Sequence, residues 1–405
     1  MQLNNSIKSL SLLLLSSFFF NSNNGFAQNP QTNERINPIT TAVPFLLIAP
    51  DSRAGGMGDI GIATSADANS MRWNAAKMQM SDKDMGMSLS YIPWLRQLVN
   101  DINLSYLSGF KRIDKDQVIG ASLFYSSLGQ VTFTDEQGLT IGDFRPHEFA
   151  VDVSYARKLA DRLSGGVSLR YIYSNLTLGQ FVQGAQTRPG MSVAGDISLF
   201  YENKDVEIGN IPATYAFGLA IRNIGSKMSY SETERRDFIP INMGIGNAIT
   251  LRPDDYNQIT FAVDLNKLMV PTPPLYDGAG RNPSNIVAGR DPDVGVVAGM
   301  FGSFTDAPGV LQADGSRSVL QEEIREVNIS AGMEYWYDNQ FAFRAGYFHE
   351  HATKGNRKYI TFGAGLRYNV FGLDVAYLVA TEQRHPLGNT IRFTLLFDFD
   401  ALGKS

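Results

Sequence analysis

Apolar and polar residues alternate along most of this chain with a period of two. The clearest run is IRFTLLFDF (391–399), and similar runs recur back to residue 85. Successive side chains of a strand point to opposite faces, so this period predicts strands with one apolar and one polar face. The segments run to about 10–14 residues, longer than the roughly 5–6 of soluble strands and long enough for a tilted strand to cross a bilayer.

The alternation predicts fourteen strands, with the following bounds: 85–92, 99–110, 117–127, 147–158, 163–177, 189–202, 213–226, 239–250, 256–266, 323–337, 340–350, 357–369, 371–380 and 389–400. The connections after even-numbered strands are short, such as 159–162 and 338–339. Those after the third, fifth, seventh and ninth are longer, and the longest is 267–322. This alternation is typical of outer-membrane barrels, with short periplasmic turns and long outer loops.

We therefore expect an all-β fold, a 14-stranded antiparallel transmembrane β-barrel over residues 85–400. The apolar faces would meet lipid, and closure is required because an open sheet edge leaves unpaired backbone groups in lipid. In the second strand we expect Ile102, Leu104 and Tyr106 to form the apolar face. Four charged residues are expected in the lumen: Arg170, Glu334, Arg367 and Arg392. Four apolar residues are exceptions expected on the lumen side: Leu107, Ile172, Trp336 and Leu396.

The N-terminus and the composition support export. Residues 1–27 combine Lys8, the apolar run 10–20 and Gly25-Phe26-Ala27, the pattern of a signal peptide cleaved after Ala27. The chain has no cysteine, so it has no disulfide or thiolate metal site. A net charge of −5 with interspersed signs gives no indication of nucleic-acid binding.

The stretch GGMGDIGIATS (55–65) contains G-x-G-x-x-G, the outline of a dinucleotide-binding loop. Only 57 residues, 28–84, precede the first strand, and no repeated βαβ units follow, so a cofactor domain is disfavoured. We instead interpret 28–84 as a plug, since glycines allow sharp turns and close backbone packing. Arg53, Asp59, Asp67 and Arg72 are candidates to pair with the inner wall. The plug residues singled out are Arg53, Gly55, Gly56, Gly58, Asp59, Gly61 and Asn74.

The segment DSRAGGMGDIGIATSADANSMRWNAAKM (51–78), followed by a barrel, resembles the N-terminal hatch of FadL-like outer-membrane barrels. More narrowly, the chain is similar to the PorV family of the type IX secretion system from about residue 40 onward. The motifs that carry this narrower resemblance are VPTPPLYDG (270–278), EYWYDNQFAFRAGYFHE (334–350), KGNRKY (354–359), FGLDVAYL (371–378) and NTIRFTLLF (389–397). Hatches of this class commonly read N-P-A where this chain has Asn74-Ala75-Ala76, which puts the local turn in doubt.

The resemblance implies an outer-membrane shuttle without enzymatic activity or cofactor. Such a protein binds the C-terminal signal domain of cargo at the large barrel subunit of the translocon. It then delivers the cargo to the PorU-type sortase complex at the cell surface. It would lie among outer-membrane lipid, with both termini periplasmic and the long loops extracellular. The alternatives are FadL-like transport of hydrophobic small molecules, or a role in lipid A deacylation, which has been suggested for this family.

Two further features are candidates for binding. His349-Glu350-His351 places two imidazoles on one strand face, as a metal site requires, but no third ligand is evident and a polar loop start is the favoured interpretation. The connection 267–322 is far longer than a barrel needs, and it serves as a partner surface, as a lid, or as both. The residues proposed for the partner surface are Pro271, Pro273, Pro274, Tyr276 and Phe301.

Overall fold

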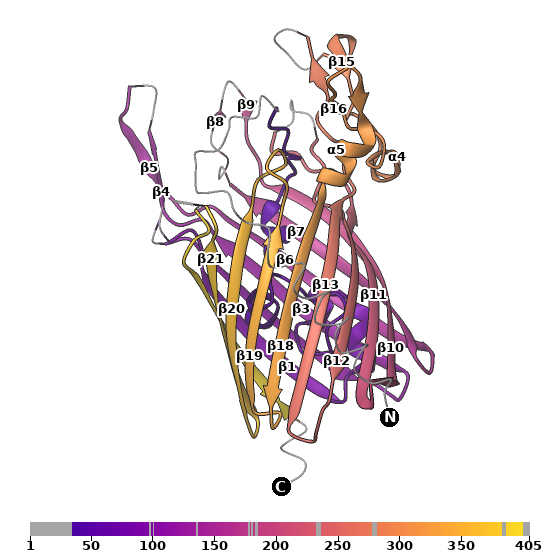
Figure 1. Ribbon diagram of the computed structural model, residues 1–405. Helices are drawn as coiled ribbons and strands as arrows, with labels where there is room; N and C mark the ends of the chain where they lie inside the picture. The colour runs from indigo at the N-terminus through magenta and orange to yellow at the C-terminus, as the bar shows by residue number, and fades with distance from the viewer. Residues whose placement is uncertain are drawn as a thin grey trace. The chain divides into compact units, whose positions relative to one another are not determined.

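The alternating segments form the strands of a closed antiparallel barrel in the computed structural model (Figure 1). The structure describes residues 35–399, except 97–98, 100, 135–136, 177–178, 180, 183–184, 232–235, 278–281 and 383–385. The predicted signal peptide therefore lies outside the described residues. Within the described part, the barrel strands are β1 (Met85–Pro93), β2 (Asn103–Arg112), β3 (Gln117–Ser127), β6 (His147–Ala160), β7 (Leu163–Asn175), β10 (Gly190–Ile208), β11 (Ile211–Gly225), β12 (Asn242–Leu251), β13 (Asn257–Leu268), β18 (Val327–Tyr337), β19 (Phe341–His349), β20 (Lys358–Tyr368), β21 (Phe371–Ala380) and β22 (Thr390–Asp398).

Each barrel strand pairs with its neighbours in chain order, and β1 pairs with β22 to close the ring. The predicted fourteen-stranded barrel and its alternation of short and long connections are thus confirmed. The short connections are tight turns: Asp338 and Asn339, between β18 and β19, both have positive φ, 52° and 51°. Asp and Asn tolerate this left-handed region better than other residues with a Cβ, which suits them to two-residue hairpins.

Several strand boundaries predicted from the sequence are wrong, including the start of the second strand, which lies at Asn103 and not at residue 99. The predicted turn 203–212 is a hairpin, because β10 and β11 stay paired across a bulge as far as Ile208 and Ile211. The strand predicted from residue 323 begins only at Val327, since α5 (Val319–Arg325) precedes it. The hydroxyl of Ser318 caps this helix by accepting the N–H of Gln321, at 3.4 Å. A Ser cap satisfies an otherwise unpaired N–H, so local capping favours helix here over the strand pattern.

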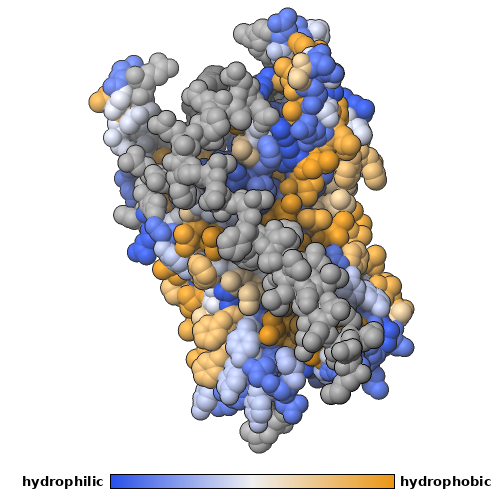
Figure 2. All heavy atoms as spheres, viewed as in Figure 1, coloured by the Kyte–Doolittle hydropathy of each residue, from blue (hydrophilic) through white to orange (hydrophobic). Residues whose placement is uncertain are grey.

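The outer wall of the barrel is apolar and the inner wall largely polar. Hydrophobic residues cover the middle of the barrel face seen in Figure 2, and hydrophilic residues gather toward its ends. Outward aromatic residues occur at two levels, as in the girdles of membrane barrels. The level nearer the long loops comprises Tyr91, Tyr125, Phe149, Tyr173, Tyr347 and Tyr377, and the level nearer the short turns comprises Tyr155, Tyr201, Tyr215, Tyr256, Tyr337, Phe341 and Phe371.

The prediction of which side chains of the second strand face lipid is wrong. Leu104 and Tyr106 are each 1% exposed and pack inside the barrel, whereas Leu107 is 41% exposed and faces outward. The reason is local: β2 carries apolar residues on both faces, and the inner ones pack against Phe45 and Leu46 of the N-terminal segment. The other three expected inner exceptions, Ile172, Trp336 and Leu396, do lie on the lumen side.

Residues 42–80 lie inside the barrel and are mostly buried, while residues 36–41 contact the long loops at the rim (Figure 1). Their short helices are η1 (Pro44–Leu47), α2 (Ser52–Gly56), α3 (Ser70–Trp73) and η2 (Ala75–Met80). The connection between β13 and β18 carries β14 (Leu275–Tyr276), η3 (Pro283–Asn285), β15 (Ile286–Ala288), α4 (Val296–Gly302), β16 (Val310–Leu311), β17 (Arg317–Ser318) and α5. Two further loop hairpins are β4 (Val131–Thr134) with β5 (Thr140–Phe144), and β8 (Phe181–Val182) with β9 (Ala185–Gln186). Among the described residues, no helix has the length and apolar character needed to cross a membrane.

Candidate functional site: the lumen segment and the long loop

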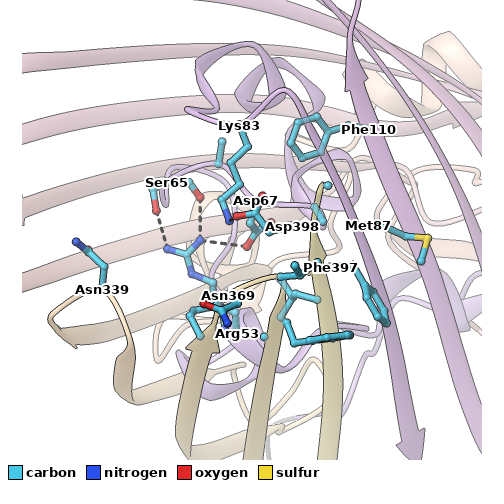
Figure 3. A pocket seen from close by; sticks show the side chains of 18 of the residues that line it. Arg53, Ser65, Asp67, Lys83, Met87, Phe110, Asn339, Asn369, Phe397 and Asp398 are labelled. Atoms are coloured by element: carbon cyan, nitrogen blue, oxygen red, sulfur yellow. Dashed lines mark hydrogen bonds and ion pairs between the residues drawn. The ribbon is translucent and has the colours of Figure 1, made fainter. Parts of the chain in front are cut away.

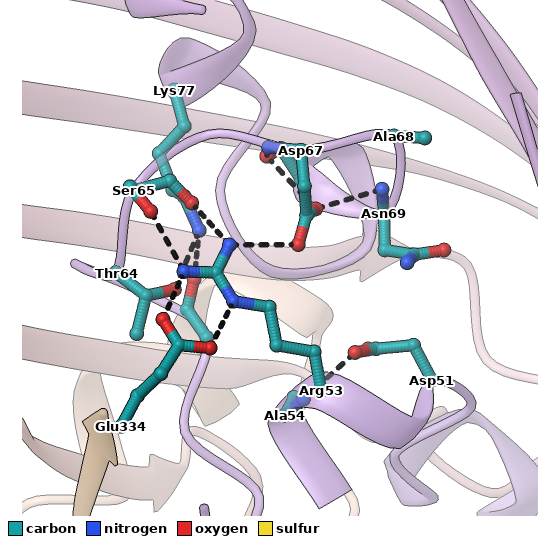
Figure 4. Close-up of polar contacts among 12 residues, drawn as sticks. Asp51, Arg53, Ala54, Thr64, Ser65, Asp67, Ala68, Asn69, Lys77 and Glu334 are labelled. Carbon is teal, nitrogen blue, oxygen red and sulfur yellow. Dashed lines mark hydrogen bonds and ion pairs between the residues drawn. The ribbon is translucent and has the colours of Figure 1, made fainter. Parts of the chain in front are cut away.

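Arg53 is the centre of the polar contacts between the N-terminal segment and the wall (Figure 4). Its Nε and Nη2 donate to the two carboxylate oxygens of Glu334 on β18, at 2.9 and 2.7 Å. Its remaining N–H groups donate to Asp67, at 3.1 Å, and to the backbone and hydroxyl oxygens of Ser65, at 3.0 and 2.7 Å. Glu334 also accepts from Arg344 on β19, at 2.7 Å. Such a buried pair persists only when its charges are compensated and its polar atoms hydrogen-bonded, and both conditions are met here.

The glycine motif fits the segment against the wall. A Cβ on Gly56 would lie 3.0 Å from the Cα of Gly363, and one on Gly58 would lie 2.8 Å from the backbone nitrogen of Tyr347. Gly61 covers the ring of Trp73, where a Cβ would overlap the indole. Gly58 also has a φ of +78°, which residues with a side chain rarely adopt. The motif therefore allows close packing and a sharp turn.

The backbone N–H groups of this motif are already used by the barrel. Gly58 donates to the hydroxyl of Thr361, at 2.8 Å, and Gly61 and Ile62 both donate to one oxygen of Asp264, at 2.9 and 3.0 Å. A phosphate-binding loop needs such groups directed at the ligand. Here a carboxylate of β13 occupies that position, so this loop cannot cradle a phosphate in this arrangement.

Asp59 connects the segment to two further strands. One of its carboxylate oxygens accepts from Arg392 on β22, at 2.6 Å, and the other accepts from the hydroxyl of Tyr359 on β20, at 2.5 Å. Gly55 lies directly over the Arg392 side chain. By contrast, Arg72 does not pair with a wall carboxylate: it donates to the carbonyl oxygen of Ile48 within the segment, at 3.3 Å.

Asn74 forms an ordered turn without the proline common in this class. Its side-chain oxygen accepts the N–H of Ala76, at 3.1 Å, and so caps η2. Its amide nitrogen donates to the carbonyls of Ile62 and of Leu199 on β10, at 3.2 and 3.0 Å. The asparagine thus connects two turns of the segment to the wall, and the alanine that replaces proline leaves the cap intact.

A cavity of about 360 Å³ lies beside the segment at the short-turn end of the barrel (Figure 3). Its lining is mixed: Phe110, Trp336 and Phe397 supply aromatic surface, while Arg53 and Asp67 supply charge. A ligand for this cavity would need both apolar and polar groups.

The long loop is fixed to the barrel rim by a second buried ion cluster, which we call the rim cluster. It comprises Lys267, Asp306, Glu322, Glu323, Glu326 and Lys354. Lys267 donates to Glu323 and Glu326, at 2.9 and 2.6 Å, and Lys354 donates to Glu322 and Glu326, at 2.7 and 3.0 Å. Burial raises the pKa of Asp306 to about 7, and the negative charges of Glu323 and Glu326 contribute to this shift.

The rim cluster turns the charged side of α5 inward and its apolar side outward, which is the opposite of an ordinary surface helix. Glu322 and Glu323 are buried, whereas Leu320 and Ile324 are 72% and 63% exposed. On α4, Val297 and Phe301 are likewise 66% and 70% exposed. Residues four apart share one face of a helix. Two short helices therefore present apolar faces outward, and we call these four residues the loop apolar surface.

The structure places the five predicted partner residues in different settings. Phe301 belongs to the loop apolar surface, while Pro274 is buried against Gly289, and Pro271, Pro273 and Tyr276 are half-buried. The carbonyl of Pro273 accepts from the amide of Asn37, at 3.0 Å. Their role in partner binding stays a prediction. Ile324 was missed because residues from 323 onward were interpreted as a strand, whereas Leu320 lay in the predicted connection but was not singled out.

The histidine pair has other contacts. Glu350 is buried and forms a two-point ion pair with Arg357, at 2.9 and 2.8 Å. Nδ1 of His351 lies 3.0 Å from the hydroxyl of Thr353. No group of three His, Asp or Glu side chains in the described part of the chain is placed to hold a metal ion.

The closed barrel, its two aromatic levels and its polar interior define the class of this chain as an outer-membrane β-barrel. The family model "Type IX secretion system protein PorV" matches residues 29–275. The chain therefore belongs to the PorV family, as its sequence motifs indicated. No curated protein sequence gave a significant match.

Several solved structures resemble this chain over most of its length. The Pseudomonas putida toluene transporter TodX is 12% identical, with a TM-score of 0.47, and the match covers 86% of this chain and 97% of that one. A Pseudomonas aeruginosa FadL homologue is 10% identical, with a TM-score of 0.43, and the match covers 90% of this chain and 99% of that one.

Proposed function

We propose that this protein is the outer-membrane shuttle of a type IX secretion system. It binds the C-terminal signal domain of cargo proteins at the large translocon barrel and delivers them to the PorU-type attachment complex. Membership of the PorV family supports the assignment to this system. Binding and delivery need no catalytic group.

The observation that carries the proposal is the loop apolar surface. Exposed apolar residues scattered singly are ordinary, but here four of them lie on two short helices of one loop. The rim cluster holds the polar side of α5 inward and so keeps Leu320 and Ile324 facing out. A surface that is held apolar by buried ion pairs is suited to a protein partner, whose own apolar residues would cover it.

We further propose that residues 28–84 act as a plug and that cargo never crosses this barrel. The ion pairs and close glycine contacts of the described residues from 36 onward support this role. In the proposed orientation, the long loops are extracellular and both termini are periplasmic. Cargo would then meet the loop apolar surface outside the cell, where the attachment complex also acts.

The test is co-purification of a cargo C-terminal signal domain with Leu320→Ser/Ile324→Ser protein from native outer membranes. We expect cargo recovery to fall by about tenfold, which corresponds to the loss of roughly 1.4 kcal/mol of binding free energy. Ile113→Ser is the matched control, because Ile113 is 56% exposed at the opposite, short-turn end. Normal cargo recovery with the double variant, or with a deletion of residues 272–318, contradicts the assignment.

The mixed cavity beside the plug is the observation that favours the competing function, transport of an amphipathic small molecule. That function requires the plug to move, whereas the shuttle does not. The crosslink described in the Discussion separates the two.

A further inference from the structure

The outer wall of the barrel has a groove of about 500 Å³ on β6, β7, β10 and β11. Its lining is almost entirely apolar: the residues that form it are Tyr155, Leu159, Val167, Ile197, Leu199, Leu219 and Ile221, with Gly165, Gly166, Ser198 and Arg157. Its volume falls in the range of small-molecule sites, roughly 300–1,000 Å³. Because this wall faces the membrane, the groove opens toward lipid.

Strand register explains why the wall is hollow here. Two outward rows of side chains cross the four strands. The first row runs Tyr155, Val167, Ile197, Ile221, and the second runs Arg157, Gly165, Leu199, Leu219. Every position carries a side chain except Gly165, so the second row has a gap. A Cβ at Gly165 would lie 3.0 Å from Cδ1 of Leu159. Leu159 is two residues beyond Arg157 on β6 and therefore borders the gap.

Arg157 stands at the edge of this gap as an exposed cation. Within the described part of the chain its side chain has no carboxylate within 4.0 Å and no hydrogen-bond partner. It pairs across the ladder with Gly165 itself, so the charge and the gap are direct neighbours. Charge complementarity therefore points to an anionic group beside an apolar chain.

The level at which the groove lies in the membrane fits a ligand with an anionic group and an apolar chain. Tyr155, Tyr201 and Tyr215 belong to the aromatic level nearer the short turns, and Tyr201 stacks at an angle on Tyr215 with ring centroids 6.5 Å apart. Such girdles mark the boundary between hydrocarbon and headgroups. Arg157 lies two residues beyond Tyr155 toward the turn, at headgroup depth, while Ile197 and Ile221 lie at hydrocarbon depth.

We propose that this groove is a binding site for one glycerophospholipid of the leaflet at the short-turn end. An acyl chain fills the gap over Gly165, and the phosphate pairs with the guanidinium of Arg157. A phosphate and a guanidinium form charge-assisted hydrogen bonds, which are the strong ones at such a boundary. This site is separate from the loop apolar surface and does not depend on the proposed function.

The test uses full-length protein in detergent, with phosphatidylglycerol added in steps and native mass spectrometry to count the lipids retained. We expect one lipid to bind more tightly than the rest. Arg157→Gln and Gly165→Leu should each weaken that binding by about tenfold, the first by removing the charge and the second by filling the gap. Lys111→Gln is the matched control, since Lys111 is an exposed cation on β2 toward the same end of the barrel but outside the groove.

Folding of each variant is checked by its heat-dependent migration in gels, and Gly165→Ala serves as a milder variant if Gly165→Leu does not fold. Equal phospholipid binding by wild type, Arg157→Gln and the Gly165 variant overturns the proposal. So does protein from native membranes that retains lipid A at this site in place of a glycerophospholipid.

Discussion

Arg53 and Glu334 form a two-point ion pair, at 2.9 and 2.7 Å, that joins a residue near the start of the folded chain to the tenth strand of the barrel. The two residues are 281 positions apart, and both are buried. The pair therefore fixes the N-terminal segment to a strand that is far from it in the sequence.

Arg53→Met should destabilise the folded protein strongly. The substitution leaves Glu334 buried with Arg344 as its remaining cation, and Asp67 loses its ion pair. Breaking one side of a buried pair costs about 3–5 kcal/mol. Urea unfolding in detergent micelles measures this cost, and the exposed Arg96 gives the control Arg96→Met. A change within about 0.5 kcal/mol, as is usual for surface positions, would show that the pair contributes little.

Gly58→Ala should loosen the segment from the wall. The new Cβ meets the backbone of Tyr347 at 2.8 Å, and an L-residue at positive φ adds about 1–2 kcal/mol of strain. Gly315→Ala is the matched control, because Gly315 has a similar φ of +83° with open space around it. Limited proteolysis should cleave the segment faster in the Gly58 variant only. Equal cleavage of the segment in the two variants would contradict the prediction.

A disulfide between positions 52 and 394 should lock the segment in place. The hydroxyls of Ser52 and Thr394 lie 3.0 Å apart, and the chain has no cysteine to interfere. We expect Ser52→Cys/Thr394→Cys to crosslink on mild oxidation, as seen by altered gel migration, while each single variant does not. Cargo recovery should be the same in oxidised and reduced protein. If oxidation abolishes cargo binding, the prediction of a static plug is wrong. If oxidation instead blocks uptake of an amphipathic small molecule, the plug must move and the transport function gains support.

Docking of the long loop should weaken as the pH rises toward neutrality. Asp306 has a pKa of about 7 in the folded protein and 3.8 in an unfolded loop, so the folded state binds the proton more tightly. Its contribution is complete below pH 3.8 and is lost as the pH rises through about 7. Loop proteolysis should therefore be faster at pH 8 than at pH 6. Asp306→Asn should reduce this difference. The control Asp314→Asn, in an exposed turn of the same loop, should leave it unchanged. A difference that persists in Asp306→Asn and disappears in Asp314→Asn contradicts the prediction.

The sequence by itself determined the barrel. The period-two alternation determines which face of each strand is apolar, and the turn residues determine where the hairpins lie. Closure follows because lipid cannot hydrogen-bond the backbone groups of a free strand edge. The same reasoning placed Glu334 and Arg392 in the lumen, since an ionised group on the lipid face is costly. These are local or one-dimensional constraints, which a sequence carries directly.

Only the tertiary structure decided the partners. Arg53 was a candidate for the wall, but its pairing with Glu334 depends on where strands 281 residues apart meet. Leu104 and Tyr106 face inward because they pack against Phe45 and Leu46 there. The alternation within β2 does not reveal these partners. The polarity of α5 likewise depends on Lys267, near the end of β13, and on Lys354, in the turn between β19 and β20. Such choices rest on three-dimensional packing and on the cost of burying an unpaired charge, and neither can be read from residues one at a time.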